Sequence, residues 1–306
     1  MNGVICIDKP SGMTSFDVVA VVRKLTHERK AGHAGTLDPM ATGVLPVFLG
    51  EATKAISLLQ CQDKRYTAGL RLGVTTDTGD ITGKALSSKP VTVSPDEVAA
   101  AALLFKGEIE QVPPMYSALK LNGRHLYDIA REGGEVERVA RKITIHDIAV
   151  TGRDEASGDY SMAVHCSKGT YIRTLCEDIG RQLGCGGTMS SLRRTFAAGF
   201  EIGQCITIGK IKALALEDKL SDIILDVEKI FVQLPQIDIS CNQAIRFRNG
   251  GALSIDRLER APASGLCRVK YAGLFIGIGE VDALERQINI RCHFNREAVI
   301  SGGEVI

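Results

Sequence analysis

The chain has 306 residues, of which 44% are hydrophobic and 24% are charged, and its formal net charge is +1. This is the composition of an ordinary globular protein, with room for one large domain or for a large and a small one. The longest apolar run, Val98–Phe105, is far too short to cross a membrane, and the N-terminus lacks the pattern of a secretory signal. We therefore expect a cytoplasmic protein that does not bind membranes.

The cysteines and the basic residues set two further limits. The 9 cysteines are scattered singly, without a Cys-x-x-Cys or His-x-x-x-His pair, which predicts reduced thiols and no zinc site. Because the net charge is close to zero, a nucleic acid would have to be held by a local basic surface. Three clusters could supply one, although each alone is more typical of a solvated surface: Arg23, Lys24, Arg29 and Lys30; Arg138, Arg141 and Lys142; Arg193 and Arg194.

The N-terminal part begins with a predicted strand at Val4–Asp8. A helix follows, which Thr14 or Ser15 can cap. Its apolar face consists of Val18, Val22 and Leu25. The next segment, Gly32–Pro46, is dense in Gly, Thr and Pro, and we interpret it as a functional loop rather than a regular element. Strand character returns at Tyr66–Leu72.

A second helix is predicted from a capping box, with Ser94 as the cap and Glu97 as its partner, and is expected to run to Phe105. Ser161–Cys166 then alternates like a strand. The next helix has an apolar stripe of Leu175, Ile179 and Leu183. A β-rich stretch covers about residues 269–294. Because helices and strands are mixed without regular βαβ alternation, we predict an α+β fold with a mixed sheet.

The segment Gly32–Pro46 is the most informative part of the sequence. Its glycines permit close approach of the backbone to a ligand, and Pro39 restricts Asp38 to an extended conformation. The result is a carboxylate that projects from a crowded loop. From the residues alone, a turn aspartate that satisfies its own backbone is the more common explanation.

This segment is similar, almost residue for residue, to the catalytic motif of the TruB-type tRNA pseudouridine synthases. Other motifs similar to those of the family occur in order over nearly the whole chain, so chance agreement is negligible. They are Asp8–Ser15, Lys64–Tyr66 with Leu72-Gly73, Pro113–Lys120, Cys166–Arg173, Ser191–Thr195, Arg248–Gly250 and Phe275–Gly279.

The resemblance implies an α+β fold with two parts. The first is a pseudouridine-synthase catalytic domain with a mixed, mainly antiparallel sheet flanked by helices, expected at residues 1–235. It would contain an RNA-gripping insertion at about 112–142. The second is a small β-rich, PUA-like RNA-binding domain at 236–306, for which a purely structural appendage is the alternative.

Carried over motif by motif, the resemblance makes Asp38 the catalytic carboxylate. Pseudouridine formation breaks an N-glycosidic bond, rotates the uracil and rejoins it through carbon, and a carboxylate beside the anomeric centre suits this chemistry. Whether Asp38 adds to the sugar, adds to the base or removes a sugar proton stays open. Arg173 is expected to pair with Asp38, orienting it and lowering its pKa. Without the motif, Arg173 would be interpreted as a surface arginine at the end of a strand.

Other residues of the chain resemble those that bind the target base. Tyr66 resembles the catalytic tyrosine that stacks on the uracil and assists proton removal from carbon, and Leu192 resembles the apolar residue on the other side of the base. Both would otherwise be interpreted as core residues. A base inside a folded tRNA arm has to be flipped out, and His33 resembles the residue that fills the vacated space. The remaining implied substrate contacts are Lys9, Tyr171 and, in the insertion, Tyr116, Lys120, Arg138 and Lys142, which would mainly meet phosphates.

The function implied by the resemblance is a monomeric RNA isomerase that converts uridine 55 in the T arm of tRNA to pseudouridine without a cofactor, a metal or a guide RNA. One alternative is a relative that works with guide RNA, although such proteins usually carry lysine-rich tails, which this chain lacks. The other is an RNA chaperone that acts on tRNA folding. A chaperone would have no need for an intact Asp38, Tyr66 and Arg173.

Overall fold

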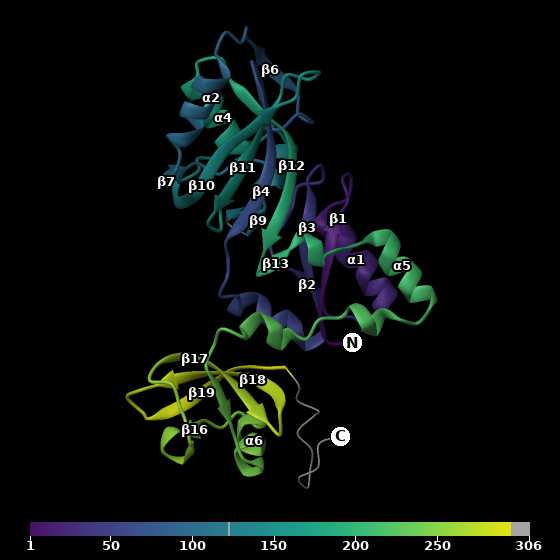
Figure 1. The fold of residues 1–306 in the computed structure, drawn as a ribbon, viewed down its shortest axis with the longest axis vertical. Coiled ribbons are helices and arrows are strands. Elements are labelled where there is room, and N and C mark those ends of the chain that lie inside the picture. The colour runs from purple at the N-terminus through teal and green to yellow at the C-terminus, as the bar shows by residue number, and fades with distance from the viewer. Residues whose placement is uncertain (122, 295–306) are drawn as a thin grey trace.

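The computed structural model describes residues 1–121 and 123–294 of the chain and places their strands in two larger sheets and two hairpins (Figure 1). The strands of the large sheet are β1 (Gly3–Lys9), β2 (Ala31–His33), β3 (Thr42–Leu49), β4 (Lys64–Leu72), β7 (Gly107–Gln111), β10 (Arg141–Arg153), β11 (Tyr160–Cys166), β12 (Gly187–Ala197), β13 (Phe200–Glu201) and β14 (Ile206–Thr207). The second sheet contains β15 (Gln236–Asp238), β16 (Leu253–Ser254), β17 (Gly265–Tyr271), β18 (Leu274–Asp282) and β19 (Gln287–His293). The hairpins are β5 (Val74–Thr76) with β6 (Ala85–Ser88), and β8 (Lys120–Leu121) with β9 (Arg124–His125).

Helices are fewer and mostly short. The α-helices are α1 (Ser15–Thr26), α2 (Pro95–Leu103), α3 (Leu126–Arg131), α4 (Ile172–Gln182), α5 (Ile208–Leu216) and α6 (Cys241–Arg248). The 3-10 helices are η1 (Gly50–Leu58), η2 (Ile202–Gln204), η3 (Leu220–Ile223), η4 (Val227–Phe231) and η5 (Ile255–Arg257).

The order of the strands confirms the predicted fold class. The large sheet runs β14-β1-β3-β12-β4-β11-β10-β7, with β2 added to β3 and β13 added to β12. Most neighbours are antiparallel, and the parallel pairs are β1 with β14, β3 with β12, and β15 with β17. The second sheet runs β15-β17-β18-β19-β16 and lies at the C-terminal end of the described chain. The protein is therefore α+β, with a large mixed sheet and a small β-rich C-terminal domain.

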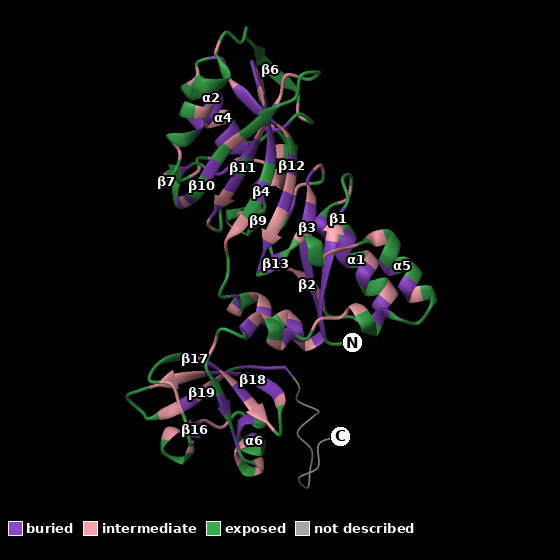
Figure 2. Ribbon diagram, viewed as in Figure 1, coloured by how far each residue is buried: buried purple, intermediate pink, exposed green. Residues whose placement is uncertain are grey.

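Three apolar clusters hold the large sheet and its attachments together, and Figure 2 shows their buried residues along the strands. One lies where α2 and α4 cover β4, β10, β11 and β12. Another lies where α1 and α5 pack on β1 and β3. The third joins η1 and η4 to the C-terminal sheet, with the rings of Phe275 and Phe294 stacked 5.3 Å apart beside Phe231. The C-terminal domain is thus docked through aromatic contacts.

The predicted helix starts are confirmed by their caps. Thr14 caps α1 and Ser94 caps α2, each in a capping box with the residue three positions on. In α1, Val18 and Val22 are buried against the sheet, as their spacing predicts. The second helix ends at Leu103, two residues before the predicted end, and Phe105 packs against the core from the following turn.

One expectation about local structure is wrong. Gly32–Pro46 is not one long loop, because Thr42–Leu49 forms the buried strand β3 and only the residues between β2 and β3 are irregular. Both faces of β3 are covered by apolar clusters, so the strand is a continuous apolar run rather than an alternating one. Arg173 lies in the first turn of α4 with 5% of its side chain exposed, so the alternative of a surface arginine at the end of a strand does not hold.

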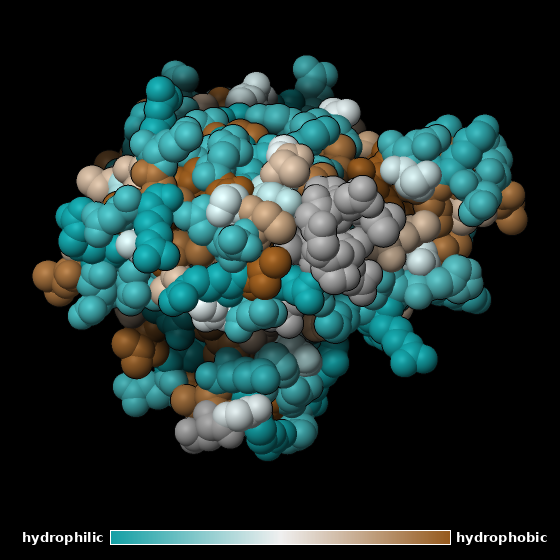
Figure 3. All heavy atoms as spheres, turned by 90° about the horizontal axis from the view of Figure 1, so that it is seen from below, coloured by the Kyte–Doolittle hydropathy of each residue, from teal (hydrophilic) through white to brown (hydrophobic). Residues whose placement is uncertain are grey.

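The outer surface is mostly polar. Viewed from the end that carries the C-terminal domain, hydrophilic residues cover most of what is visible, with hydrophobic ones scattered among them (Figure 3). Among the described residues, no helix combines the length and the apolar character that a membrane crossing requires.

Candidate active site

Asp38 lies in the loop of residues 34–41 between β2 and β3. The hydroxyl of Ser15 accepts a hydrogen bond from the Leu37 amide at 2.9 Å, and the Ala41 amide donates to the Asp38 carbonyl at 3.0 Å. These bonds fix the backbone on both sides of Asp38. The carboxyl side chain keeps 32% of its surface exposed. The loop therefore presents a carboxylate that is held in place and can be reached.

Lys9 holds the same loop from within. Its side chain is fully buried, and its ammonium donates to the carbonyls of Pro10, Met13 and Pro39 at 3.0, 2.5 and 3.2 Å. Burial lowers the pKa of Lys9 to about 8. An ammonium has three N–H donors, and all three are used here, so none is left for an RNA phosphate. The predicted RNA contact of Lys9 has no support in this geometry, which makes Lys9 an anchor of the Asp38 loop.

Arg173 forms the ion pair with Asp38 that the sequence predicts. Its Nε atom lies 3.0 Å from Oδ2 of Asp38, and its Nη2 atom lies 3.2 Å from Oδ1. The guanidinium also donates to the carbonyls of Thr78 at 2.9 Å and Tyr116 at 2.6 Å. One hydrogen bond, from Nη2, and one close ion-pair contact, from Nε, thus bring both carboxylate oxygens of Asp38 against the same guanidinium. Arg173 thereby ties α4, the loop after β5 and the predicted insertion to the Asp38 loop.

The pKa of Asp38 departs from the expectation. Burial raises the pKa of the Asp38 carboxyl, and this outweighs the lowering by Arg173, while the charge of Asp80 adds to the rise. Arg173 lowers the pKa of Asp38 as predicted, but the opposing effect of burial is larger. A raised pKa makes the carboxylate more basic than an ordinary aspartate.

Tyr66 and Leu192 lie on neighbouring strands of the large sheet. Tyr66 on β4 is opposite Arg194 of β12 in the strand register, and Leu192 precedes Arg194 by two residues in β12. Both side chains are buried in the same apolar cluster as Leu37, the residue before Asp38. Burial raises the pKa of Tyr66 to about 12, and the Asp38 charge acts in the same direction. The cluster thus brings together residues that are far apart in the sequence.

Arg194 is the residue that sequence reasoning missed. It was grouped with exposed basic residues, but its side chain is fully buried and donates to the carbonyls of Val44 at 2.8 Å, Gly35 at 2.8 Å and Thr36 at 3.5 Å. Its charge also lowers the pKa of Tyr66. The two-residue strand period could have revealed it, because Arg194 falls on the same face as the apolar Leu192.

The rest of the cluster Arg193–Arg194 does not form an RNA surface either. Arg193 makes two bonds to the carboxylate of Asp8, with Nη2–Oδ2 at 2.9 Å and Nη1–Oδ1 at 3.1 Å. Neither the solvated surface that such a cluster alone suggests nor an RNA contact fits this pair, because Arg194 is buried and Arg193 is paired with an aspartate. Their bonds instead join β12 to the end of β1 and to the Asp38 loop.

His33 and Tyr171 lie at the edges of the site. His33 ends β2, and its Nε2 atom is buried without a hydrogen-bond partner among the described residues. Its ring lies 5.3 Å from that of Phe16, and burial lowers its pKa, which favours the neutral form. Tyr171 precedes α4, where its amide donates to Gln111 Oε1 at 2.7 Å and its carbonyl accepts from Gln111 Nε2 at 3.0 Å. Burial raises the pKa of Tyr171.

The predicted RNA-gripping insertion is built from β8, β9 and α3, and it ends in the large sheet. Tyr116 is half-buried, and Lys120 is exposed on β8. Arg138 pairs with Glu135 at 3.2 Å, and Lys142, already in β10, pairs with Glu108 at 3.1 Å. Residue 122 of the insertion and residues 295–306 of the predicted C-terminal domain lie outside the described part of the chain. Arg138 and Lys142 are thus partly neutralised by glutamates.

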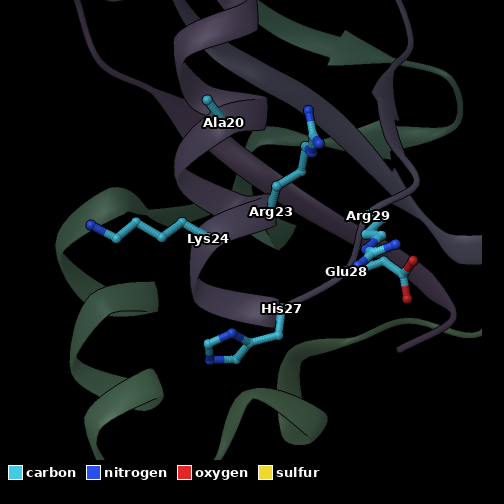
Figure 4. Close-up of a pocket in the computed structure, with 6 residues that line it drawn as sticks. All are labelled: Ala20, Arg23, Lys24, His27, Glu28 and Arg29. Carbon is cyan, nitrogen blue, oxygen red and sulfur yellow. The ribbon is translucent and has the colours of Figure 1, made fainter.

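A second basic surface lies at the end of α1. Arg23, Lys24 and Arg29 surround a shallow hollow together with His27 and Glu28 (Figure 4). Glu28 pairs with the N-terminal amine at 3.0 Å. Within residues 1–121 and 123–294, no carboxylate forms an ion pair with the three basic side chains. This surface is therefore the better placed of the two for contact with phosphates.

The described residues around Asp38 offer no set of metal ligands. The one group with suitable spacing in the described part of the chain is Asp63, His146 and His165, which does not include Asp38. The arrangement around Asp38 is an oriented, basic carboxylate next to an aromatic ring and an aliphatic side chain. It can attack an electrophilic carbon or remove a proton, and it can do so beside a planar base.

Comparison with known proteins identifies the family. The model of the TruB family pseudouridylate synthase N-terminal domain matches residues 23–172, and that of the tRNA pseudouridylate synthase B C-terminal domain matches residues 173–232. A tRNA pseudouridine synthase B from Aromatoleum aromaticum is 45% identical over 284 residues, covering 92% of this chain and 89% of the relative. The chain belongs to the TruB family of pseudouridylate synthases. A second relative, from Escherichia coli K12, is 39% identical over 293 residues and 92% of each chain.

Solved structures agree with the TruB assignment at the level of the fold. A Cbf5-Nop10-Gar1 complex contains a chain that is 28% identical, with a TM-score of 0.73 over 95% of this chain and 84% of that one. An H/ACA ribonucleoprotein bound to a substrate RNA contains one that is 26% identical, with a TM-score of 0.70 and the same coverage. The protein is thus an isomerase of the pseudouridine synthase class, with the TruB-like combination of a large mixed sheet and a small β-rich domain.

Proposed function

We propose that this TruB family member converts uridine 55 in the T arm of tRNA to pseudouridine, with Asp38 as the essential carboxylate. The observation that carries the proposal is the ion pair of Arg173 with Asp38, together with Tyr66 and Leu192 in the apolar cluster that contains Leu37, the residue before Asp38. The relatives that are 39–45% identical over 92% of the chain are tRNA pseudouridine synthases B, which supports tRNA as the substrate.

In this proposal Asp38 acts at the sugar or at the base, and Arg173 keeps its two oxygens in a fixed plane. The glycosidic bond between N1 of uracil and C1′ breaks, the base rotates, a bond forms between C5 and C1′, and the proton on C5 is lost while N1 gains one. Atoms and electrons balance within the substrate, so the reaction needs no redox cofactor. The raised pKa of Asp38 strengthens it as a base or nucleophile.

The residues beside the pair would hold the flipped base. Tyr66 contacts one face of the uracil and Leu192 the other. Because its pKa is about 12, Tyr66 is a neutral phenol at neutral pH and a weak base, so ring contact is its main contribution. His33, neutral and at the rim, fills the space that the base leaves. Tyr171 and Tyr116 would complete the lining around the flipped base. Hydrogen bonds to Gln111 and Arg173 hold their backbones in place.

RNA is proposed to lie along the basic surface of α1 and the insertion. Arg23, Lys24 and Arg29 would contact phosphates, with Lys120, Arg138 and Lys142 contributing from the insertion. We place the boundary between the catalytic domain, 1–235, and the RNA-binding domain, 236–306, at the segment that precedes β15.

We propose that the protein works as a monomer in the cytoplasm without guide RNA. The guide-dependent alternative has some support, because chains in H/ACA and Cbf5 complexes share the fold at 26–28% identity. The tRNA pseudouridine synthases B are more similar, at 39–45%. This difference favours the stand-alone enzyme.

The test is incubation of the purified protein with an unmodified tRNA transcript, in the presence of a chelator and without other RNA, followed by mapping of pseudouridine. The expected result is one pseudouridine, at position 55, and none in a transcript with cytidine at that position. Modification that appears only with an added guide RNA would overturn the stand-alone proposal. Tight tRNA binding with no pseudouridine under any condition would favour the RNA chaperone.

A further inference from the structure

We propose that Asp63, His146 and His165 form a binding site for one divalent transition-metal ion of the zinc class, on the large sheet and apart from the Asp38 pair. Nε2 of His146 lies 3.3 Å from Oδ2 of Asp63, and Nε2 of His165 lies 3.8 Å from the same oxygen. All three potential ligand atoms lie within 4.8 Å of one another. Two imidazoles and one carboxylate thus converge on a common point.

The backbone builds this convergence in a way that no short sequence motif reveals. His165 belongs to β11 and His146 to β10, and between the pairs Ile145–Cys166 and Asp147–His165 the register shifts by one residue. His146 is the extra residue of this bulge. In a regular strand the side chains of His146 and Asp147 would face opposite sides of the sheet. At the bulge both are exposed, whereas the preceding residue, Ile145, is buried. The bulge therefore turns a second imidazole toward His165.

Asp63 completes the group from a third segment. It immediately precedes β4, whose residue Arg65 pairs with His165 in the sheet. The neighbouring carboxylate, Asp147, does not compete for the same position, because it is paired with Lys106 at 2.8 Å. Each of the three side chains is only partly exposed, between 34% and 41%. A ligand at their centre would be open to solvent on one side.

The ligand chemistry selects the metal. Zinc binds imidazole nitrogen and carboxylate oxygen at about 2.0–2.2 Å, which puts neighbouring ligand atoms of a tetrahedral site roughly 3.3 Å apart. The two distances to Asp63 are 3.3 and 3.8 Å and the whole set spans no more than 4.8 Å, so the side chains would have to draw together around the ion. Magnesium and calcium prefer sites made entirely of oxygen, so two imidazoles disfavour them. Three protein ligands and one water would complete a zinc site.

A hydrogen-bonded cluster without metal is the competing explanation. In that case each neutral imidazole would donate its Nε2–H to Asp63, with the two ring centroids 4.8 Å apart. With a metal, the same two nitrogens would instead be unprotonated and would bind the ion together with the Asp63 carboxylate. The two explanations differ in whether the group binds a divalent ion, which the titration below measures.

A metal at this site would hold the segment between η1 and β4 in place. Residues 59–63 connect η1, next to the C-terminal domain, to β4, which carries Tyr66. A metal bound by Asp63 and the two histidines would fasten the end of this connection to β10 and β11. Metal binding should therefore slow hydrogen exchange in residues 60–63, while exchange at the Asp38 loop stays the same.

The experiment uses the full-length protein after removal of metal with a chelator. Titration with zinc against an indicator dye should give one ion per chain, and cobalt should give the visible spectrum of a site with nitrogen and oxygen ligands. H146A, H165A and D63N should each weaken zinc binding at least about tenfold. H125A, which removes a partly exposed histidine from the β8–β9 hairpin, is the matched control and should bind zinc like the wild type.

Thiols are the main source of a false result, since Cys6 and Cys205 lie with their sulfur atoms 2.9 Å apart. A cobalt spectrum with sulfur-to-metal charge transfer, or zinc binding that is lost in C6S/C205S but kept in H146A, would overturn the proposal. So would the absence of zinc binding at micromolar concentration. The spectrum of the wild-type protein decides between the two ligand sets even if a variant does not fold.

Discussion

Replacing Arg173 by lysine tests the electrostatic part of the site. Arg173 makes one hydrogen bond and one further ion-pair contact to the Asp38 carboxylate, and one hydrogen bond each to the carbonyls of Thr78 and Tyr116. An ammonium keeps the positive charge but cannot meet both carboxylate oxygens with a rigid, planar group. R173K therefore keeps a cation near Asp38 and removes its orientation.

The magnitude follows from the number of bonds lost. A hydrogen bond to a charged group contributes about 1.5–3 kcal/mol, so loss of the Nη2 bond to Asp38 in the transition state should slow the chemical step roughly 10- to 150-fold. At least one of the carbonyls of Thr78 and Tyr116 also loses its donor in a buried position, which should reduce the free energy of unfolding by about 1–3 kcal/mol. The protein should remain folded, since domains of this kind have about 5–15 kcal/mol of stability.

The assay is single-turnover pseudouridine formation between pH 5 and pH 8, with an unfolding curve at each pH. The carboxylate of Asp38 is the active form in our proposal, so activity should rise with pH as Asp38 loses its proton. Burial raises the pKa of Asp38 and Arg173 partly offsets the rise. Weakening that offset in R173K should raise the pKa further and move the acid limb of the profile to higher pH.

The matched control is R181K, on the same helix, where the side chain is 74% exposed and pairs with Asp178. It should leave both rate and profile unchanged. A rate for R173K within a factor of two of the wild type would refute the argument that the pair belongs to the catalytic site. A slower rate with an unmoved acid limb would limit Arg173 to positioning, without an electrostatic effect on Asp38.

Three other outcomes follow from the site and its surroundings. Y66F keeps the ring and should slow single-turnover chemistry by less than about tenfold, the value of one neutral hydrogen bond, whereas Y66A should slow it far more. R23A should weaken tRNA binding and reduce the slope of log K against log salt by about one unit. K142A should have the same effects to a smaller extent, because Glu108 already pairs with Lys142. The pKa of Lys9 is lowered from 10.5 to about 8, so the unfolded chain binds more protons than the folded one between these pH values. The free energy of unfolding of the wild type should therefore rise by about 3 kcal/mol from pH 8 to pH 10.5. Denaturant unfolding of K9M should not show this rise.

Local elements were predictable where the sequence carries a complete local signal. The caps at Thr14 and Ser94 are such signals, because side chain and backbone bonds close within four residues. The spacing of Val18 and Val22 likewise depends only on the helical period. The strand β3 was missed because Thr42–Leu49 lies inside the large sheet, where both faces are covered and the alternating pattern disappears.

The site was predictable only through the family motifs. No local pattern relates Asp38 to Arg173, 135 positions away, and from the residues alone a turn aspartate and a surface arginine were the ordinary explanations. The burial of Arg194 and the inward ammonium of Lys9 depend on tertiary packing, which turns apparent RNA contacts into anchors of the Asp38 loop. The bulge at His146 is also a tertiary feature, since it exists only relative to the register of β11.

The central claim is that the Asp38 carboxylate performs the chemistry, and D38N tests it most directly. Asparagine has nearly the same size and can still accept a bond from Arg173, so the stability should change by only about 1 kcal/mol. The measurement pairs tRNA affinity with single-turnover pseudouridine formation at position 55. We predict that D38N binds tRNA at least as tightly as the wild type and forms no detectable pseudouridine, because an amide is a poor nucleophile and a poor base. A rate above about a tenth of the wild-type rate would contradict this account and reduce Asp38 to a turn residue that is held by Arg173.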